Sequence, residues 1–469
     1  MVRHHSRQIS LTEGNIAKNM LLYFFPILFG SFFQQLYNTI DAIIVGNFVS
    51  QEALAAVGGA SGNIINLLVG FFVGLAGGTS VIIAQYYGAR EYDNVKLAVH
   101  TGIALAIAGG AGLMVIGLLI THQALVWMRT PEDVFPMAET YIRIYFLGTV
   151  PNVIFNIGSG ILNASGDSKK PLFFLIVSCI TNIILDLLFV AVFRMGVLGV
   201  ALATILSQTV SAVLVLYTLS HSRDCYRLFF REIRFTGRIL KQIIRIGLPS
   251  GLQSTMFAIA NTLIQSTINS FGSQVMAAWT AFGKTDSIFW MILGALGITQ
   301  TTFSGQNYGA RKFGRMRRVV QTGALMTTVF TVFISIVIIL LRRAVLGLFL
   351  SDEETIRIAI TIMMAEVPYY ILYVPMETFP SACRSAGDTL RPMLITASGV
   401  CVFRILWLVF IMPRWHTPTM LAYSYPASWA LTSVIYFVYY YRMKWLVRYL
   451  PKDLDPKTVI AEYRSRKVS

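Results

Sequence analysis

The sequence predicts an all-α integral membrane protein with twelve transmembrane helices arranged as two pseudo-symmetric six-helix bundles. Composition predicts the membrane: hydrophobic residues make up 55% of the 469 residues and charged residues only 13%, about half the charged share of a soluble domain. Apolar stretches of about 20 residues, long enough to cross a bilayer, recur along the whole chain. An internal repeat predicts the two bundles.

The repeat has a constant displacement, which carries position 85 onto position 306 and position 165 onto position 386. The segment Gln-Tyr-Tyr-Gly-Ala-Arg at 85–90 returns as Gln-Asn-Tyr-Gly-Ala-Arg at 306–311, and Ser-Gly-Asp-Ser at 165–168 returns as Ala-Gly-Asp-Thr at 386–389. Such self-similarity over a long stretch indicates that the chain arose by duplication. Because six is an even number, both halves enter the membrane in the same direction, as in parallel repeats.

The apolar segments divide the chain into four parts. We expect an N-terminal bundle at 1–219, a basic cytoplasmic linker at 220–242, a C-terminal bundle at 243–445 and a cytoplasmic tail at 446–469. The twelve helices are expected to start near Met20, Leu54, Val95, Pro136, Pro171, Gly196, Ile243, Val275, Val319, Arg357, Pro392 and Pro418. Prolines within these segments favour kinks because each frees a backbone carbonyl; they are Pro26, Pro151, Pro249, Pro375 and Pro380.

Basic residues predict the orientation in the membrane. Of the 38 Lys and Arg residues, 28 fall in one alternate set of loops and termini and five in the other, with five in or at the ends of helices. The positive-inside rule then places both termini in the cytoplasm. We expect the protein to lie in a bacterial cell membrane. Anionic lipid headgroups are the expected partners of these charges, and no nucleic-acid-binding motif accompanies them.

Ionisable residues inside the membrane are functional candidates because burying them is costly. The N-terminal half has Asp41 in its first helix and Asp186 in its fifth, about 8 Å and 12 Å below the outer boundary. Asn182 lies one turn from Asp186 on the same helix face, and Thr204 in the sixth helix reaches a similar depth. These hard oxygen ligands suit a small cation such as Na⁺, and a close carboxylate pair can instead hold a proton.

A buried salt bridge is the alternative for these aspartates. Arg143 in the fourth helix reaches about the same depth and would neutralise one carboxylate. Spacing alone does not choose between an ion site and a structural pair.

The C-terminal half does not repeat the aspartates. At the repeat displacement Asn182 corresponds to Phe403 and Asp186 to Trp407, and the counterpart of Asp41 lies near Ile264. This half instead carries a different set of ionisable residues: Lys284, Asp286, Glu366, Glu377 and Arg404. Glu366 and Arg404 reach similar depths and are expected to form a structural ion pair, while a conformational role for Asp286 or Glu377 stays open.

Polar, soft and aromatic side chains are candidates for lining a solute pathway. Methionine and aromatic surfaces accommodate varied apolar and cationic shapes, although each such residue is more often simply packed between helices. The candidates are Gln34, Tyr37, Asn156, Gln253, Met256, Trp290, Met291 and Tyr370.

Together these features resemble the multidrug and toxic-compound extrusion (MATE) family, bacterial drug-efflux type, over essentially the whole chain. The set Asp41, Asn182, Asp186 and Thr204 matches the family's cation-binding positions in the N-terminal lobe. The resemblance implies a secondary antiporter in which H⁺ or Na⁺ entry drives export of organic, often cationic compounds, with a role in antibiotic resistance. It implies no cofactor beyond the coupling ion, and we expect a monomer.

One departure from the family limits what the resemblance implies. Some members carry a carboxylate in the seventh helix that helps to form a cation site in the C-terminal lobe, and this chain has none there. That second site is therefore not expected here.

Three other functions compete with this one. A lipid-linked oligosaccharide flippase would need more cationic side chains in the membrane than Arg143, Lys284 and Arg404. A receptor or structural protein leaves the asymmetric aspartates without a purpose. An enzyme is not expected, because no nucleophile triad, nucleotide loop or metal-ligand spacing of the four cysteines is present.

Overall fold

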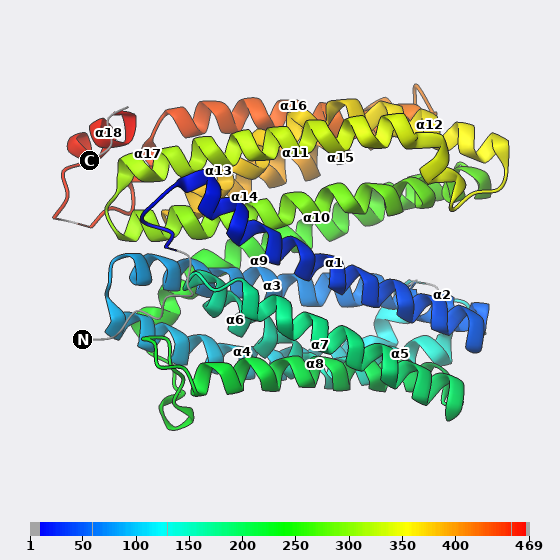
Figure 1. Ribbon diagram of the computed structural model, residues 1–469. Helices are drawn as coiled ribbons and strands as arrows, with labels where there is room; N and C mark the ends of the chain where they lie inside the picture. Colours follow the sequence, from blue (N-terminus) through cyan, green and yellow to red (C-terminus); the bar gives the residue numbers. More distant parts are fainter. Residues whose placement is uncertain (1–9, 59, 129, 452, 466–469) are drawn as a thin grey trace. The chain divides into compact units, whose positions relative to one another are not determined.

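The computed structural model describes residues 10–58, 60–128, 130–451 and 453–465, and these residues are almost entirely helical (Figure 1). Every expected helix start falls in a helix. The first half contains α1 (Ile16–Phe48), α2 (Gln51–Gly58), α3 (Ala60–Gly88), α4 (Tyr92–Trp127), α5 (Phe135–Leu147), α6 (Thr149–Ala164), α7 (Lys169–Asp186), the π-helical turn η1 (Leu187–Val192) and α8 (Gly196–Ser220).

The second half has more interrupted helices. After the short 3-10 turn η2 (Phe230–Glu232), it contains α9 (Gly237–Asn269), α10 (Ser273–Gly309), α11 (Phe313–Gly347), α12 (Glu353–Glu366), the 3-10 segment η3 (Val367–Tyr373) and α13 (Val374–Ser385). It continues with α14 (Leu390–Thr396), the π segment η4 (Ala397–Val402), α15 (Phe403–Leu406), the π segment η5 (Trp407–Ile411), α16 (Pro418–Tyr441), α17 (Lys444–Val447) and α18 (Pro456–Arg464).

The helix boundaries carry the repeat. The displacement that carries position 85 onto position 306 also carries the bounds of α1 onto those of α9, and the first residue of α4 onto that of α11. The repeated loops also share backbone conformation, since Arg90 and Arg311 both have φ near +59°. An ion pair is repeated as well: Asp167 binds Lys170 at 2.8 Å and Asp388 binds Arg391 at 3.6 Å. Both halves therefore share one scaffold.

The chain forms two compact units. One contains Leu21–Thr255, and the other contains Met256–Ser469 together with Thr12–Met20. The division lies within α9 and not at residue 243, where the second bundle was expected to begin. The reason is local packing, because the first half of α9 lies directly against α3.

Nine helices among the described residues are long and apolar enough to cross a membrane. A tenth span is the pair α5 and α6, bent by 50° at Gly148. Pro151 stands in the first turn of α6 and has no N–H to donate across the break. α9 and α16 are also long enough to cross a membrane. They are rich in hydroxyl, amide and tyrosine side chains, which lowers their hydropathy.

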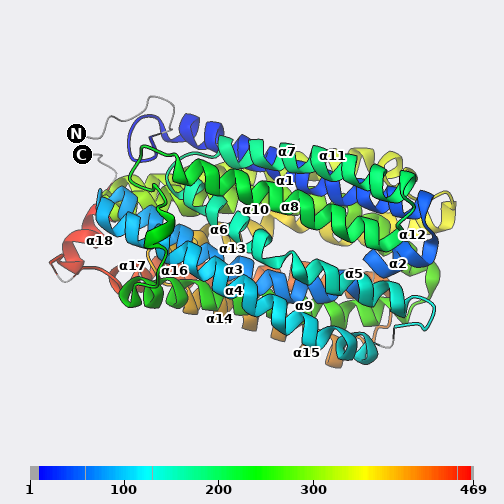
Figure 2. The same cartoon turned by 90° about the horizontal axis from the view of Figure 1, so that it is seen from below.

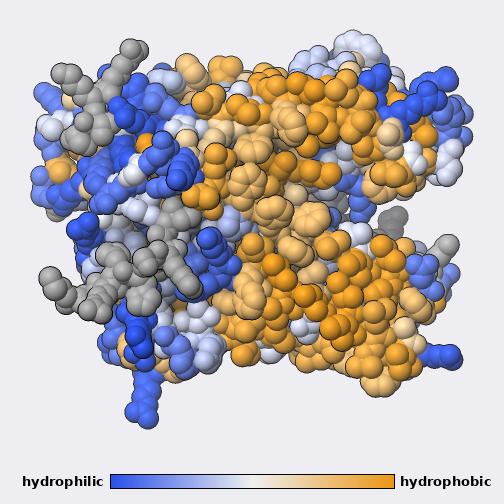
Figure 3. Space-filling view, viewed as in Figure 1, coloured by the Kyte–Doolittle hydropathy of each residue, from blue (hydrophilic) through white to orange (hydrophobic). Residues whose placement is uncertain are grey.

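The surface agrees with a protein that sits in a bilayer. On the face seen in Figure 3, hydrophobic residues cover the middle of each unit and hydrophilic residues gather at the helix ends. Many large apolar side chains on this scaffold are exposed, including Leu119, Leu340 and Phe333. Lipid, and not water, is the medium in which such an exterior is stable.

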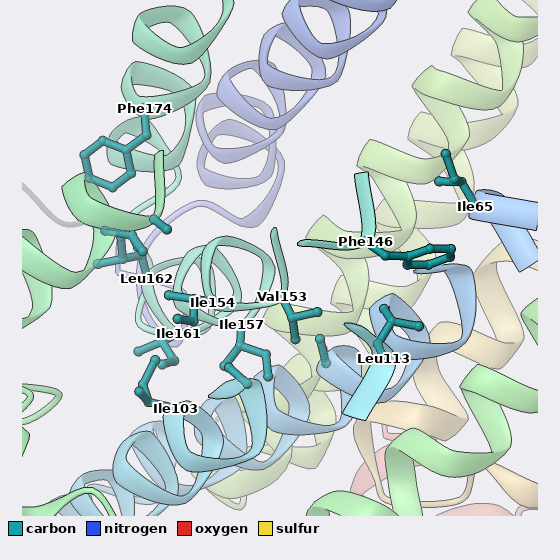
Figure 4. Packing of buried hydrophobic residues seen from close by; sticks show 14 of the residues in the cluster. Ile65, Ile103, Leu113, Phe146, Val153, Ile154, Ile157, Ile161, Leu162 and Phe174 are labelled. Atoms are coloured by element: carbon teal, nitrogen blue, oxygen red, sulfur yellow. The ribbon is translucent and has the colours of Figure 1, made fainter. Parts of the chain in front are cut away.

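The core of the first unit is built around α6, which packs against α3, α4 and α8 (Figures 2 and 4). Ile157 and Ile161 of α6 are buried in the same cluster as Ile103 of α4. The Phe146 ring lies against Gly117, where a Cβ would come within 2.3 Å of the ring. This core holds α5, α7 and α8 in fixed register around the polar residues described below.

Two helices of the first unit touch through glycine backbones. A Cβ on Gly78 of α3 would lie 2.5 Å from the Ile243 carbonyl oxygen, and a Cβ on Gly247 of α9 would lie 2.4 Å from the Leu75 carbonyl oxygen. Small residues at four-residue spacing allow this approach in membranes. The contact leaves no room for a side chain.

We expect Gly78→Ala to destabilise the protein by roughly 1–3 kcal/mol, because the added methyl group must push α3 away from α9. Gly77→Ala is the matched control: it is one residue away, and its Cβ would meet nothing within 4 Å. That variant should be neutral or gain about 0.5–1 kcal/mol from reduced chain entropy. Thermal unfolding in detergent measures both, and equal melting temperatures would contradict the close contact.

Candidate functional site

The first unit brings together the four residues that the sequence singled out. Asp41 comes from α1, Asn182 and Asp186 from α7, and Thr204 from α8. Their side chains are almost fully buried, with exposures of 6%, 0%, 0% and 1% respectively. The Asp41 carboxylate interacts with the side chains of the other three, so the four converge on one place.

Helix geometry positions these groups. Asn182 and Asp186 are four residues apart and face the same side of α7. α7 packs against α8, which carries Thr204, and against α1, where the Leu175 side chain fills the space beside Gly30. Directly after Asp186 the helix changes to the π-helical turn η1, a feature that often accompanies functional sites.

The oxygens at this place have no regular hydrogen-bond partners within the described residues. Asp41 Oδ1, both Asp186 carboxylate oxygens, the Asn182 amide and Thr204 Oγ1 are all buried without one. The groups are close enough to interact but are not aligned as donor and acceptor. Buried polar groups are normally satisfied, so a cluster of several unsatisfied oxygens fits a site for a proton or a small cation.

The buried salt bridge is not formed in the structure. Arg143 Nη2 binds Glu139 Oε1 at 2.7 Å, one turn away on α5, and the Arg143 side chain is half exposed. His122 Nδ1 lies 3.2 Å from the same carboxylate oxygen. Within the described residues neither Asp41 nor Asp186 has an ion pair with a basic side chain, so their negative charge is left without a counter-ion from the protein.

A layer of tyrosines surrounds the carboxylates, and of these only Tyr37 was a candidate from the sequence. The Tyr141 side chain of α5 interacts with that of Thr204, and it lies close enough to both aspartates to interact with them electrostatically. Tyr37 of α1 and Tyr145 of α5 both interact with Gln208 of α8. The four-residue spacing of Tyr141 with Tyr145 and of Thr204 with Gln208 puts each pair on one helix face. Because these side chains are uncharged, that spacing alone does not single them out in the sequence.

The candidate pathway residues are dispersed. In the first unit Tyr37 lies in the tyrosine layer, Gln34 is exposed, Gln253 is half-buried, and Asn156 donates to the Asn152 carbonyl at 2.9 Å. In the second unit Met256 and Met291 are half-buried. Trp290 and Tyr370 instead hydrogen-bond to Asp286, and Tyr370 is fully buried, so it is a packing residue in this structure.

A second polar cluster lies inside the second unit. Asp286 of α10 accepts hydrogen bonds from Trp290 Nε1 at 2.6 Å and from the Tyr370 hydroxyl. Arg404 of α15 interacts electrostatically with Asp286 and with Glu366 of α12. The expected Glu366–Arg404 pairing is therefore an attraction within a cluster and not a direct bond, because Arg404 Nε donates to Ser428 Oγ at 3.2 Å.

Glu377 lies apart from that cluster. Its Oε1 occupies the space beside Gly297 of α10, where a Cβ would come within 1.9 Å. Its charged neighbour is Arg384, two turns further along α13. This arrangement fixes α13 closely against α10 and provides no group of converging ligands.

Comparison with known proteins agrees with the fold. A model of the MatE family matches residues 26–188 and 249–409, most of the chain and nearly symmetric in its two halves. The probable multidrug resistance protein YoeA of Bacillus subtilis is 27% identical over 439 residues, covering 92% of this chain and 94% of the relative. The probable multidrug resistance protein NorM of Thermotoga maritima is 23% identical and covers 85% and 86%.

Solved structures share the whole fold. One, described as the outward-facing conformation of a multidrug resistance MATE family transporter, superposes with a TM-score of 0.87 at 23% identity. It covers 94% of this chain and 99% of that chain. A transporter from Pyrococcus furiosus gives a TM-score of 0.86 with the same coverage. The predicted all-α membrane fold is thereby confirmed.

We expect Arg143→Gln to change stability by about 1 kcal/mol or less, because Arg143 is half exposed and binds the partly buried Glu139, not a fully buried carboxylate. If Arg143 neutralised a buried aspartate, its removal would cost about 3–5 kcal/mol. Thermal unfolding decides between these values. Glu139→Gln is the matched control and should behave like Arg143→Gln, whereas a large loss for Arg143→Gln alone would restore the salt-bridge alternative.

Proposed function

Because this chain belongs to the MatE family of multidrug and toxic-compound extrusion transporters, which are transporters and not enzymes, we propose that it exports organic, often cationic compounds in exchange for H⁺ or Na⁺. The relatives support the class of cargo, since their names describe multidrug resistance or multidrug export. No cofactor other than the coupling ion is needed for such an exchange.

The observation that carries the proposal is the group of buried oxygens without hydrogen-bond partners in the first unit. Asp41 and Asp186 would carry the coupling ion, and Asn182 and Thr204 would be neutral ligands. Two carboxylates that face each other without a basic partner repel one another. A proton shared between them or a Na⁺ ion held by their oxygens relieves this repulsion, which supports reversible binding of one of these ions.

The same residues suggest how binding leads to movement. Asp41 lies near the end of α1, while Pro26, which lacks an N–H, lies in its first half. When the ion attaches Asp41 to Asp186 on α7, α1 is drawn toward α7, and Pro26 provides a weak point at which it bends. Loss of the ion frees Asp41. The cycle then alternates the access of the organic compound to the two sides of the membrane.

Charge distribution supports a position in the cell membrane with both termini in the cytoplasm, and we propose that the protein acts as a monomer. The basic loops of one side, including Arg311–Arg318 and the segment from Arg223 to Lys241, would lie against anionic lipid headgroups. The linker is held to the first unit by an ion pair between Lys96 and Glu232 at 2.8 Å. It is further held by the Phe229 N–H, which donates to His100 Nε2 at 3.0 Å.

We expect Asp41→Asn to reduce ion-driven efflux at least tenfold while the protein still folds, because an amide cannot gain and lose the charge that binds the ion. Efflux of a cationic dye from vesicles with an imposed ion gradient measures this. Glu139→Gln removes an acidic residue from the surface of the same unit and is the control, with efflux expected at the normal rate. Undiminished efflux by Asp41→Asn would remove this residue from the mechanism.

The same vesicles identify the coupling ion. Proton and sodium gradients are imposed separately, and the ion that drives dye export is the one that the site uses. If neither gradient drives export by the unaltered protein, ion-coupled antiport itself is wrong, whatever the variants do. Lipid-linked oligosaccharide flipping would then be the function to test next.

A further inference from the structure

The second unit has residues at the positions that correspond to the ion site of the first. At the repeat displacement α8 coincides closely with α16, and α7 with η1 coincides closely with the segment from Leu390 to Ile411. Tyr145 then corresponds to Glu366, Thr204 to Tyr425 and Gln208 to Trp429. The stretch from Asn182 to Asp186 corresponds to the stretch from Phe403 to Trp407, which contains Arg404.

These corresponding residues meet in the second unit as well. The Arg404 side chain is only 4% exposed. Its guanidinium carbon lies 3.9 Å from the centre of the Tyr425 ring, and its Nε donates to Ser428 Oγ. Arg404 thus lies on the counterpart of Thr204, and it extends from a helix whose counterpart carries Asn182 and Asp186. The side chain occupies the region where the first unit gathers its oxygens.

The charges around Arg404 come from positions that carry no charge in the first unit. The acidic groups that face it are Glu366 of α12, 2% exposed and with Oε1 lacking a hydrogen-bond partner, and the half-buried Asp286 of α10. The other ionisable groups around it are Tyr373 of η3, Cys401 of η4 and Tyr425 of α16. Each unit therefore has two carboxylates in its interior, but within the described residues only the second has a basic side chain beside them.

We propose that Arg404 is a tethered cation that takes, in the second unit, the place of the exchangeable ion bound by the first. The transporter then has one exchangeable ion site and not two. This inference rests on the proposed function of the Asp41 site. A guanidinium keeps its charge at all working pH values and is held here by the Tyr425 ring as well as by charge. It cannot leave, so the second unit keeps this positive charge throughout the cycle.

The geometry around Asp286 differs from that around the aspartates of the first unit. Asp286 accepts two hydrogen bonds, from Trp290 and Tyr370, and the Tyr370 ring stacks on Phe289 with centroids 3.8 Å apart. Asp41 Oδ1 and both Asp186 carboxylate oxygens, in contrast, have no hydrogen-bond partner within the described residues. The Asp286 carboxylate is thus held by fixed donors, whereas those oxygens of the first unit remain available to an ion.

The first test uses Asp41→Asn, which disables the proposed exchangeable site. Purified protein is titrated with Na⁺ at constant pH while tryptophan emission is recorded. Trp290 reports on the second cluster because its Nε1 binds Asp286, and Trp290→Phe identifies its contribution. We expect the Trp290 signal of Asp41→Asn to be flat. A saturable response that disappears when Glu366→Gln is added would overturn the inference.

The second test removes the tethered cation in the same background. Arg404→Met keeps a long apolar side chain without the charge, and the Trp290 signal should then gain a saturable response to Na⁺. Arg404→Lys keeps the charge and should stay flat. A flat signal in a folded Arg404→Met protein would show that Arg404 does not substitute for an ion.

The remaining outcomes are also decisive. If Arg404→Met does not fold but the double variant Arg404→Met with Glu366→Gln does, the guanidinium is needed to neutralise Glu366, as the inference requires. If neither variant folds, the Asp41→Asn titration decides. Failure of the proposed function looks different. It appears as absent ion-driven efflux by the unaltered protein, or as full efflux by Asp41→Asn, whatever the Trp290 signal does.

Discussion

The cost of placing carboxylates in a membrane interior is the constraint on which the rest of this structure depends. An ionised group away from water is stable only beside a counter-charge or several donors. Asp41 and Asp186 have no basic partner in the described part of the first unit, and Asp41 Oδ1 and both Asp186 oxygens lack a hydrogen-bond partner there. On the proposed function, a proton or cation that arrives and leaves supplies what is missing. A transporter can use this requirement, because the free energy of ion binding becomes available to change the conformation of the helices that carry the ligands.

The scaffold must hold such ligands accurately and still allow one helix to move. The buried core around α6 holds α7 and α8 together, so Asn182, Asp186 and Thr204 keep their positions. α1 is different: it carries Asp41 and contains a proline in its first half. Accuracy comes from packed side chains, which tolerate little change in volume, and the movement that we propose is that of the helix in which Pro26 has no N–H to donate. The division of roles follows from local sequence.

Much of this could be predicted from the sequence. Apolar length predicts the helices, and the constant repeat displacement predicts two related halves, because duplication preserves loops such as 85–90 and 306–311. Four-residue spacing correctly placed Asn182 beside Asp186. Depth alone did not place Arg143, because it fixes height in the membrane but not the direction around the helix, and the side chain faces outward to Glu139. Pro151 predicted a kink close to Gly148, where α5 and α6 are bent. The π-helical turns depend on tertiary packing and have no simple sequence signal.

The two halves show how a preserved scaffold can carry different charged residues. The carboxylates of the second unit are not copies of Asp41 and Asp186, but both units carry the cost of charge in their interior, and a cation relieves it whether it comes from solution or from the chain. A basic side chain in one half removes the need for an ion there and makes the positive charge of that half permanent. Arg404 over the Tyr425 ring has this geometry. The other half can then respond to a single ion without competition from its twin. Loss of symmetry at the site, within a preserved scaffold, is thus a direct route from a repeated bundle to a transporter with one ion-dependent half.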